Sequence, residues 1–377
     1  MKRILLCLLT LFFLPMPGQA VEINGKSGVL MDVATGTVLF EENPNERLAP
    51  ASVTKVMTML LIMEAVDDGR IAMTDTVTAS EAAAAKGGSQ VYLKVGETMT
   101  VREMLKSIAV SSANDCACAM AEHIAGSESA FVEKMNEKAA QLGMADTHFV
   151  NCTGLDDGPE AADHRTSAKD IALMSRELLK NHPKIKEFTT IWMDTIRNGT
   201  FGLSNTNKLV RFYPGATGLK TGFTSGAGYC LSATAEREGL ELIAVVMGAE
   251  TSAKRNESCK QLLDYGFANY ALYTPELTEA APVPVKLGKA ETVSVQLSES
   301  GQLLVEKAKK SGITSETTTE PEISAPVAKG QRLGTMILRT GEETLKEIPL
   351  VAGEDVPRLT FGDLAIKVLR RAAMARG

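Results

Sequence analysis

The chain has 377 residues, 44% hydrophobic and 23% charged, which is enough for two or three globular domains with sizeable cores. Its net charge of −6 at pH 7 argues against nucleic acid as a partner, because phosphate binding needs a basic surface. Six cysteines are too few for a disulfide scaffold, and four isolated histidines without ligand spacing predict that no metal is bound.

The first 20 residues have the pattern of a secretory signal peptide. Two basic residues precede an apolar stretch over 4–14, and a small-x-small motif ends at Ala20. About 11 apolar residues are too few to cross a hydrocarbon core of roughly 30 Å. We therefore expect an exported protein whose mature chain starts near Val21.

The next part of the chain predicts an α/β (α+β) domain over residues 21–275. Short apolar runs on either side of the turn 34–36 predict a β-hairpin. Apolar residues at helical spacing predict helices over 52–66, 101–125 (two segments), 129–142 and 167–181. Strand patterns return over 217–249. This order indicates an antiparallel sheet that is flanked by helices.

The composition changes after Tyr273. Residues 274–290 are rich in proline and polar residues, as linkers are, and short β-type runs then predict a small all-β, sandwich-like domain over 276–356. The last segment, 357–377, combines apolar residues at helical spacing with basic residues beside them. It is typical of an amphipathic helix on an anionic membrane surface, and the alternative is a helix that packs on the β domain.

Ser52 and Lys55 stand at the start of the first apolar helix. They are neighbours on one helix face, and apolar residues follow Lys55. Burial would disfavour the charged amine and lower its pKa, and a neutral amine can take the proton of a serine hydroxyl. The alternative is that Ser52 only caps the helix while the Lys55 side chain extends to water. The pair alone favours this alternative.

Two further motifs favour catalysis instead. Ser112 and Asn114 form S-x-N at a break between helices, where a hydroxyl and an amide can face a cleft. Lys220 and Thr221 begin K-T-G on a predicted strand and offer a positive charge and a hydroxyl to a carboxylate. Gly222 would let a ligand approach that strand closely. The order S-x-x-K, S-x-N, K-T-G indicates an active-site-serine enzyme.

These motifs resemble those of the penicillin-binding, active-site-serine D-alanyl-D-alanine carboxypeptidases of the bacterial cell wall. The resemblance runs through residues 27–270 and includes the segments GVLMDVATGTVLFEENPNERLAPASVTKVMT, AVSSANDCACAMAE and TGLKTGFTSGAGYCL. It implies that Ser52 is the acylated nucleophile and Lys55 its general base. It also implies that Ser112 and Asn114 relay protons and orient the substrate.

The resemblance extends to the substrate-binding strand. It implies that Lys220, which also serves catalysis, lies beside the terminal carboxylate of the substrate together with Thr221, Gly222 and Thr224. The backbone N–H groups of Ser52 and Phe223 would form the oxyanion hole. Arg255 is the best match for a basic residue that helps to hold the carboxylate, and Lys254 is the alternative.

The implied reaction is acyl transfer without a cofactor. Ser52 would attack the bond between the two terminal D-alanines of a peptidoglycan stem pentapeptide, and water would hydrolyse the acyl-enzyme. β-Lactams would acylate the same serine. The tail would contact the outer face of the cytoplasmic membrane. Two alternatives stay open: a peptidoglycan DD-endopeptidase, and a non-catalytic wall- or penicillin-binding module. A class A β-lactamase is disfavoured, because E-x-x-L-N is missing between Asn114 and Lys220.

Overall fold

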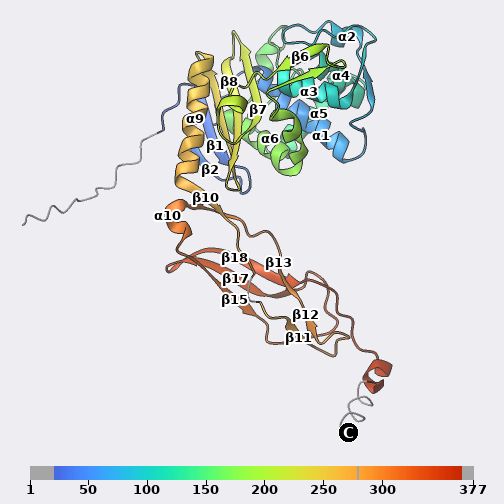
Figure 1. The fold of residues 1–377 in the computed structure, drawn as a ribbon, viewed down its shortest axis with the longest axis vertical. Coiled ribbons are helices and arrows are strands. Elements are labelled where there is room, and N and C mark those ends of the chain that lie inside the picture. The colour runs from blue at the N-terminus through green and yellow to red at the C-terminus, as the bar shows by residue number, and fades with distance from the viewer. Residues whose placement is uncertain (1–20, 278–279, 367–377) are drawn as a thin grey trace, which may run out of the picture.

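The computed structural model describes residues 21–277 and 280–366. A rounded N-terminal domain lies at one end of the molecule, and an elongated, strand-rich C-terminal domain extends from it (Figure 1). The predicted signal peptide, 1–20, and the end of the predicted terminal helix, 367–377, lie outside the described residues. Within the described part of the chain, no helix is both long enough and apolar enough to cross a bilayer.

A five-stranded sheet in the order β2-β1-β9-β8-β7 forms the centre of the N-terminal domain. Its strands are β1 (Ser27–Asp32), β2 (Val38–Glu42), β7 (Ala216–Thr224), β8 (Gly228–Arg237) and β9 (Leu240–Ala249). All neighbours are antiparallel, and β1 pairs with β9 although the two are far apart in the sequence. The predicted hairpin, the predicted strands and the antiparallel sheet are confirmed.

Helices cover both faces of this sheet (Figure 1). The predicted helices are confirmed as α1 (Lys55–Asp67), α3 (Val101–Ser111), α4 (Asn114–Ala125), α5 (Glu128–Gln141) and α6 (Ala168–Asn181). On the other face, α9 (Ser252–Asn269) packs against β8 and β9. This helix was not predicted, because its buried apolar residues, such as Leu262 and Phe267, follow a polar first half.

Hydroxyl side chains begin several helices. The Thr100 hydroxyl accepts the Glu103 amide and starts α3 in a capping box, and Ser127 starts α5 in a similar way. Ser167 accepts the Asp170 amide at the start of α6, as the sequence indicates.

Smaller elements complete the domain: η1 (Ala51–Thr54), α2 (Glu81–Ala84), η2 (Ala161–Asp163), η3 (Pro183–Ile185), α7 (Lys186–Thr189), α8 (Leu209–Phe212), and the hairpins β3 (Thr76–Thr78) with β4 (Thr98–Thr100) and β5 (Met193–Ile196) with β6 (Phe201–Ser204).

In its described residues the C-terminal domain is built from strands, as predicted, with one short helix, α10, in addition. One sheet has the order β12-β11-β16 and the other β13-β18-β17-β15. The elements are β11 (Val283–Lys286), β12 (Thr292–Val293), β13 (Val295–Leu297), α10 (Lys307–Lys310), β15 (Ile313–Thr319), β16 (Ile323–Ser324), β17 (Arg332–Thr340) and β18 (Glu343–Ala352). The linker prediction is wrong over 283–286, because Val283 and Val285 alternate into a small core and make this segment a strand.

A strand pair joins the two domains. β10 (Tyr270–Tyr273) follows α9 directly and pairs antiparallel with β14 (Leu303–Glu306). β10 therefore lies before the predicted boundary at residue 275 but pairs with a strand that lies well after it. The C-terminal domain is thus attached by backbone hydrogen bonds as well as by the chain itself.

Candidate active site

Ser52 lies in the 3-10 turn η1, which comes directly before α1. The Ser52 side chain does not cap a helix, since the turn begins at Pro50 without a side-chain cap bond. The sequence predicts one continuous helix here, whereas the structure divides the segment into η1 and α1. The serine hydroxyl is therefore left free for another partner.

Two glycines let neighbouring segments press against η1. A Cβ atom at Gly154 would lie only 1.8 Å from the Ala51 carbonyl oxygen. A Cβ atom at Gly222 on β7 would lie 2.7 Å from the Pro50 carbonyl oxygen and 3.1 Å from the Ser52 amide nitrogen. The missing side chain at Gly222 therefore makes room for η1, and the expected approach of a ligand to this strand stays a prediction.

Lys55 is completely buried at the start of α1. Its Nζ lies 2.9 Å from Ser52 Oγ and donates a hydrogen bond to the Thr153 carbonyl at 2.7 Å. Burial lowers the pKa of Lys55 to about 7, although Cys152 and Asp115 nearby favour the charged form. At neutral pH much of this amine carries a lone pair that can accept the Ser52 proton.

Ser112 and Asn114 lie between α3 and α4, as predicted. Ser112 ends α3 in the left-handed region at φ +63°, and Asn114 is the first residue of α4. The Asn114 amide donates to the Gly87 carbonyl at 2.8 Å. Ser112 Oγ and Asn114 Oδ1 are buried without a hydrogen-bond partner among the described residues. A ligand could satisfy both atoms, whose isolation costs free energy.

Lys220 and Thr221 lie in the middle of β7, and both are buried. Lys220 Nζ donates to the Thr221 carbonyl at 2.9 Å. Burial, and then the positive charges of Lys55 and Arg255, lower the pKa of Lys220. A negatively charged ligand beside Lys220 would favour its protonated form.

Arg255 lies on α9 and is only 5% exposed. It donates to the Cys230 carbonyl at 3.4 Å, and its guanidinium carbon lies 5.8 Å from the centre of the Tyr229 ring. Lys254, the alternative in the sequence, makes an exposed ion pair with Glu250. Of these two residues, Arg255 is therefore the one that packs against β8 and lowers the pKa of Lys220.

Phe223 and Thr224 end β7. The Phe223 side chain is 53% exposed, and its ring centre lies 4.3 Å from that of Tyr229. Thr224 Oγ1 accepts the Ala227 amide at 3.1 Å and so shapes the turn to β8. The sequence predicts a role in the oxyanion hole for the backbone N–H of Phe223. Its exposed ring adds an apolar surface beside that group.

The sequence did not reveal that His164 supports the serine turn. Its Nε2 lies 2.7 Å from Thr54 Oγ1, and Thr54 Oγ1 donates to the Ala51 carbonyl at 2.8 Å. The Val150 amide donates to His164 Nδ1, so the ring proton is on Nε2. Burial lowers the pKa of His164 to about 4, which keeps the ring neutral. No sequence signal links His164 to Thr54, because only the fold brings them together.

Asp115 was also missed. It is fully buried beside Asn114 and accepts the amides of Val91, Leu93 and Cys116 at 2.9–3.1 Å. These bonds fix the segment around Val91 against α4. The acid that follows S-x-N was a signal for this residue, because a carboxylate in an apolar helix needs several donors.

Comparison with known proteins identifies relatives of both domains. A family model described as D-alanyl-D-alanine carboxypeptidase matches residues 15–251, and one described as Penicillin-binding protein 5, C-terminal domain, matches residues 276–358. D-alanyl-D-alanine carboxypeptidase DacF of Bacillus subtilis is 48% identical over 345 residues, which are 90% of this chain and 87% of the relative.

Solved structures are similar as well. Penicillin-binding protein 5 of Haemophilus influenzae has a TM-score of 0.74 and 30% identity, with 89% of this chain and 98% of that chain covered. Penicillin-binding protein D2 of Listeria monocytogenes, solved in an ampicillin-bound form, has a TM-score of 0.60 and 32% identity over 65% of this chain and 98% of that chain. The chain belongs to the D-alanyl-D-alanine carboxypeptidase family.

Proposed function

We propose that the chain is a serine-type D-Ala-D-Ala carboxypeptidase that removes the terminal D-alanine from peptidoglycan stem pentapeptides. The observation that carries the proposal is the distance of 2.9 Å between Ser52 Oγ and the Nζ of a completely buried Lys55. Membership of the family supports the same activity, as does the 48% identity with DacF.

In the proposed reaction Ser52 Oγ attacks the carbonyl carbon between the two terminal D-alanines, and Lys55 Nζ accepts the hydroxyl proton. The backbone N–H groups of Ser52 and Phe223 stabilise the oxyanion. The carbon–nitrogen bond then breaks, and the leaving amine takes a proton from Lys55 by way of the Ser112 hydroxyl. Water, deprotonated in the same way, hydrolyses the ester and restores Ser52. The Asn114 amide orients the substrate.

The substrate carboxylate would bind at the positive side of the site. Lys220 and Arg255 supply charge, and the hydroxyls of Thr221 and Thr224 supply hydrogen bonds. A bound carboxylate favours the protonated form of Lys220, which burial and the neighbouring cations disfavour in the free protein. A β-lactam, which carries a carboxylate near its reactive carbonyl, would acylate Ser52 in the same position.

Substitution of the nucleophile tests this proposal. Ser52→Ala should abolish D-alanine release from a synthetic pentapeptide ending in D-Ala-D-Ala. It should also abolish the increase in protein mass that covalent attachment of one penicillin molecule causes in the unaltered chain. Ser225→Ala is the matched control, because Ser225 is exposed in the β7–β8 turn. Penicillin binding without D-alanine release by the unaltered chain would instead support a non-catalytic binding protein.

We further propose that the chain is exported and that its terminal helix holds it on the outer face of the cytoplasmic membrane. The signal-peptide pattern supports export, and an intact mass starting at Val21 in the cell envelope would test it. The described start of the terminal helix has Phe361, Leu364 and Ile366 at 89%, 41% and 54% exposure. Leu287, 47% exposed, lies beside this segment, since its carbonyl accepts the Leu359 amide.

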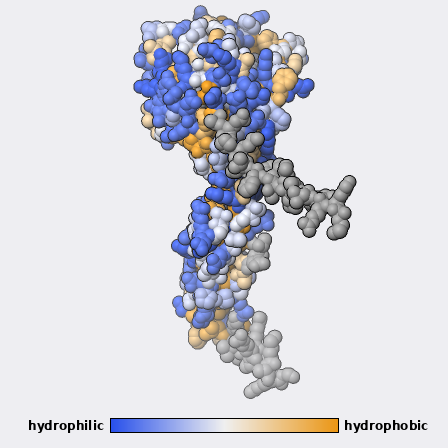
Figure 2. Space-filling model, turned by 90° about the vertical axis from the view of Figure 1, so that its left-hand side faces the viewer, coloured by the Kyte–Doolittle hydropathy of each residue, from blue (hydrophilic) through white to orange (hydrophobic). Residues whose placement is uncertain are grey.

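These side chains give the tip of the C-terminal domain an apolar character. Hydrophobic residues gather at this tip, far from the N-terminal domain (Figure 2). The basic residues of the predicted amphipathic helix, Lys367, Arg370, Arg371 and Arg376, lie outside the described residues. Apolar contact with the acyl region and attraction of basic residues to anionic lipids would act together.

A further inference from the structure

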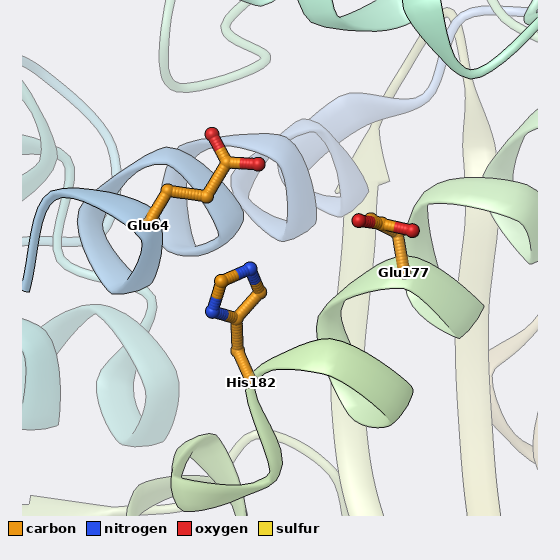
Figure 3. A group of neighbouring side chains, drawn as sticks. All are labelled: Glu64, Glu177 and His182. Atoms are coloured by element: carbon orange, nitrogen blue, oxygen red, sulfur yellow. The ribbon is translucent and has the colours of Figure 1, made fainter. Parts of the chain in front are cut away.

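A second group of chemically active side chains lies where α1 and α6 end, and the proposed peptidase reaction does not use it. Glu64 comes from the last turn of α1, Glu177 comes from α6, and His182 follows the end of α6 (Figure 3). One potential ligand atom of each residue lies within 4.8 Å of the others. We call these three residues the α1–α6 cluster.

His182 is oriented toward the two carboxylates by a fourth residue. Its Nδ1 lies 2.6 Å from Asp67 Oδ2, and because a carboxylate accepts, Nδ1 is the donor of this hydrogen bond. Nε2, the other ring nitrogen, has no hydrogen-bond partner in the described part of the chain and is available as a ligand. A ring nitrogen points into the space between Glu64 and Glu177 (Figure 3). Histidine ligands of metals commonly donate their second N–H to a carboxylate in this way.

The charges around the cluster favour a cation. Two carboxylates this close repel each other unless a positive charge lies between them. Lys138 Nζ lies 2.6 Å from Glu64 Oε1 and offsets one of the charges, whereas Glu177 has no ion pair or hydrogen bond among the described residues. The carbonyl ends of α1 and α6 also favour positive charge, and α1 has no basic residue in its last turn.

We propose that the α1–α6 cluster binds a divalent transition-metal ion of the zinc type. His182 Nε2 and one oxygen each from Glu64 and Glu177 are the protein ligands, and water completes the coordination. An imidazole nitrogen beside two carboxylates suits zinc, whereas magnesium and calcium prefer ligand sets of oxygen alone.

The ion would join the C-terminal ends of two helices and so stabilise α1, which carries Lys55 at its other end. The sequence predicts no metal site because its histidines are isolated. The ligands come from two separate helices, and only folding brings them together.

The test uses the full chain, treated with EDTA, dialysed, and then titrated with zinc chloride. We expect about one zinc ion to bind per chain and the melting temperature to rise by roughly 5 °C or more when zinc exceeds its dissociation constant about a hundredfold. Cobalt(II) in place of zinc should give visible absorption bands of a four- or five-coordinate site, a readout independent of stability.

Glu177→Gln and His182→Gln should each weaken zinc binding at least tenfold. Each should also abolish the zinc-dependent rise in the melting temperature and the absorption bands of bound cobalt. Glu177→Gln preserves shape at a position without polar partners, so misfolding is not expected to mimic the result. Glu187→Gln and His123→Gln are matched controls outside the cluster, and both should retain zinc binding. Two results would overturn the proposal: no zinc-dependent rise in the melting temperature, or wild-type zinc affinity in both cluster variants. Neither of these results bears on the peptidase activity.

Discussion

Lys55 has two properties that a general base for Ser52 needs at neutral pH. It is within hydrogen-bond distance of Ser52 Oγ, and burial lowers its pKa to about 7. An amine with this pKa is basic enough to take a proton, and about half of it is unprotonated near pH 7. The apolar residues of α1 that surround it thus have a chemical role as well as a structural one.

The acylation rate should therefore depend on pH. Because the neutral amine is the active form, the rate of acylation of Ser52 by a fluorescent penicillin should rise as pH passes through about 7 and level off above pH 8. Lys55→Arg should lower the rate by roughly 10²–10⁴-fold at every pH, since a guanidinium stays protonated. Lys260→Arg, on the exposed part of α9, should behave like the unaltered chain. A rate that is flat between pH 5.5 and 8.5 would contradict the role of Lys55.

At the scale of elements, the position of η1 depends on close packing rather than on its own sequence. The turn lies so close to Gly154 and Gly222 that neither position has room for a side chain. Two consecutive hydrogen bonds, from His164 to Thr54 and from Thr54 to the Ala51 carbonyl, also hold the turn in place. The Ser52 amide and hydroxyl are thereby placed by three segments that are distant in the sequence. A small displacement of any of them would move Ser52.

Gly154→Ala should test this packing. Its Cβ would overlap the Ala51 carbonyl, and Gly154 has φ +81°, so we expect a loss of roughly 2–4 kcal/mol of unfolding free energy and slower acylation. Gly126→Ala is the control, because Gly126 has φ +83° but no atom lies within 4 Å of the added Cβ. It should cost about 1 kcal/mol and leave acylation unchanged. Equal effects of the two changes would show that backbone conformation alone is responsible.

Much of the site could be predicted because its motifs keep their order and their residue types along the chain. Ser52, Lys55, Ser112 and Lys220 are recognisable without a structure, since each has a side chain that the chemistry needs. His164 could not be predicted, because its partner is a backbone carbonyl reached through Thr54. The contact of Gly222 with η1 could not be predicted for a related reason: a sequence records a missing side chain but not what occupies the space.

At the scale of the whole molecule, two domains with different surfaces are joined by the β10–β14 pair. The N-terminal domain contains Ser52 and Lys55, and the apolar tip lies at the opposite end of the C-terminal domain (Figures 1 and 2). The all-β class of the second domain could be predicted from its alternating runs. The pairing of β10 with β14 could not, because no local pattern identifies a partner strand in another domain.

The proposed membrane contact predicts a specific loss of vesicle binding. The full chain should bind vesicles that contain phosphatidylglycerol, and the double change Phe361→Asp and Leu364→Asp should weaken binding roughly a hundredfold, because two apolar side chains are lost from the interface. The circular dichroism spectrum should not change, since both side chains are exposed. Val95→Asp, at an exposed position of the N-terminal domain, is the control. Unaltered binding of the double variant would place the contact elsewhere.

The unpaired atoms Ser112 Oγ and Asn114 Oδ1 have a consequence for how far this protein can be stabilised. Each isolated buried polar atom costs about 1–3 kcal/mol, a substantial part of the 5–15 kcal/mol by which a typical domain is stable. A chain optimised for thermal endurance alone would replace both residues with apolar ones. Retaining them leaves the protein less stable than it could be, and a ligand that satisfies both atoms would recover this free energy.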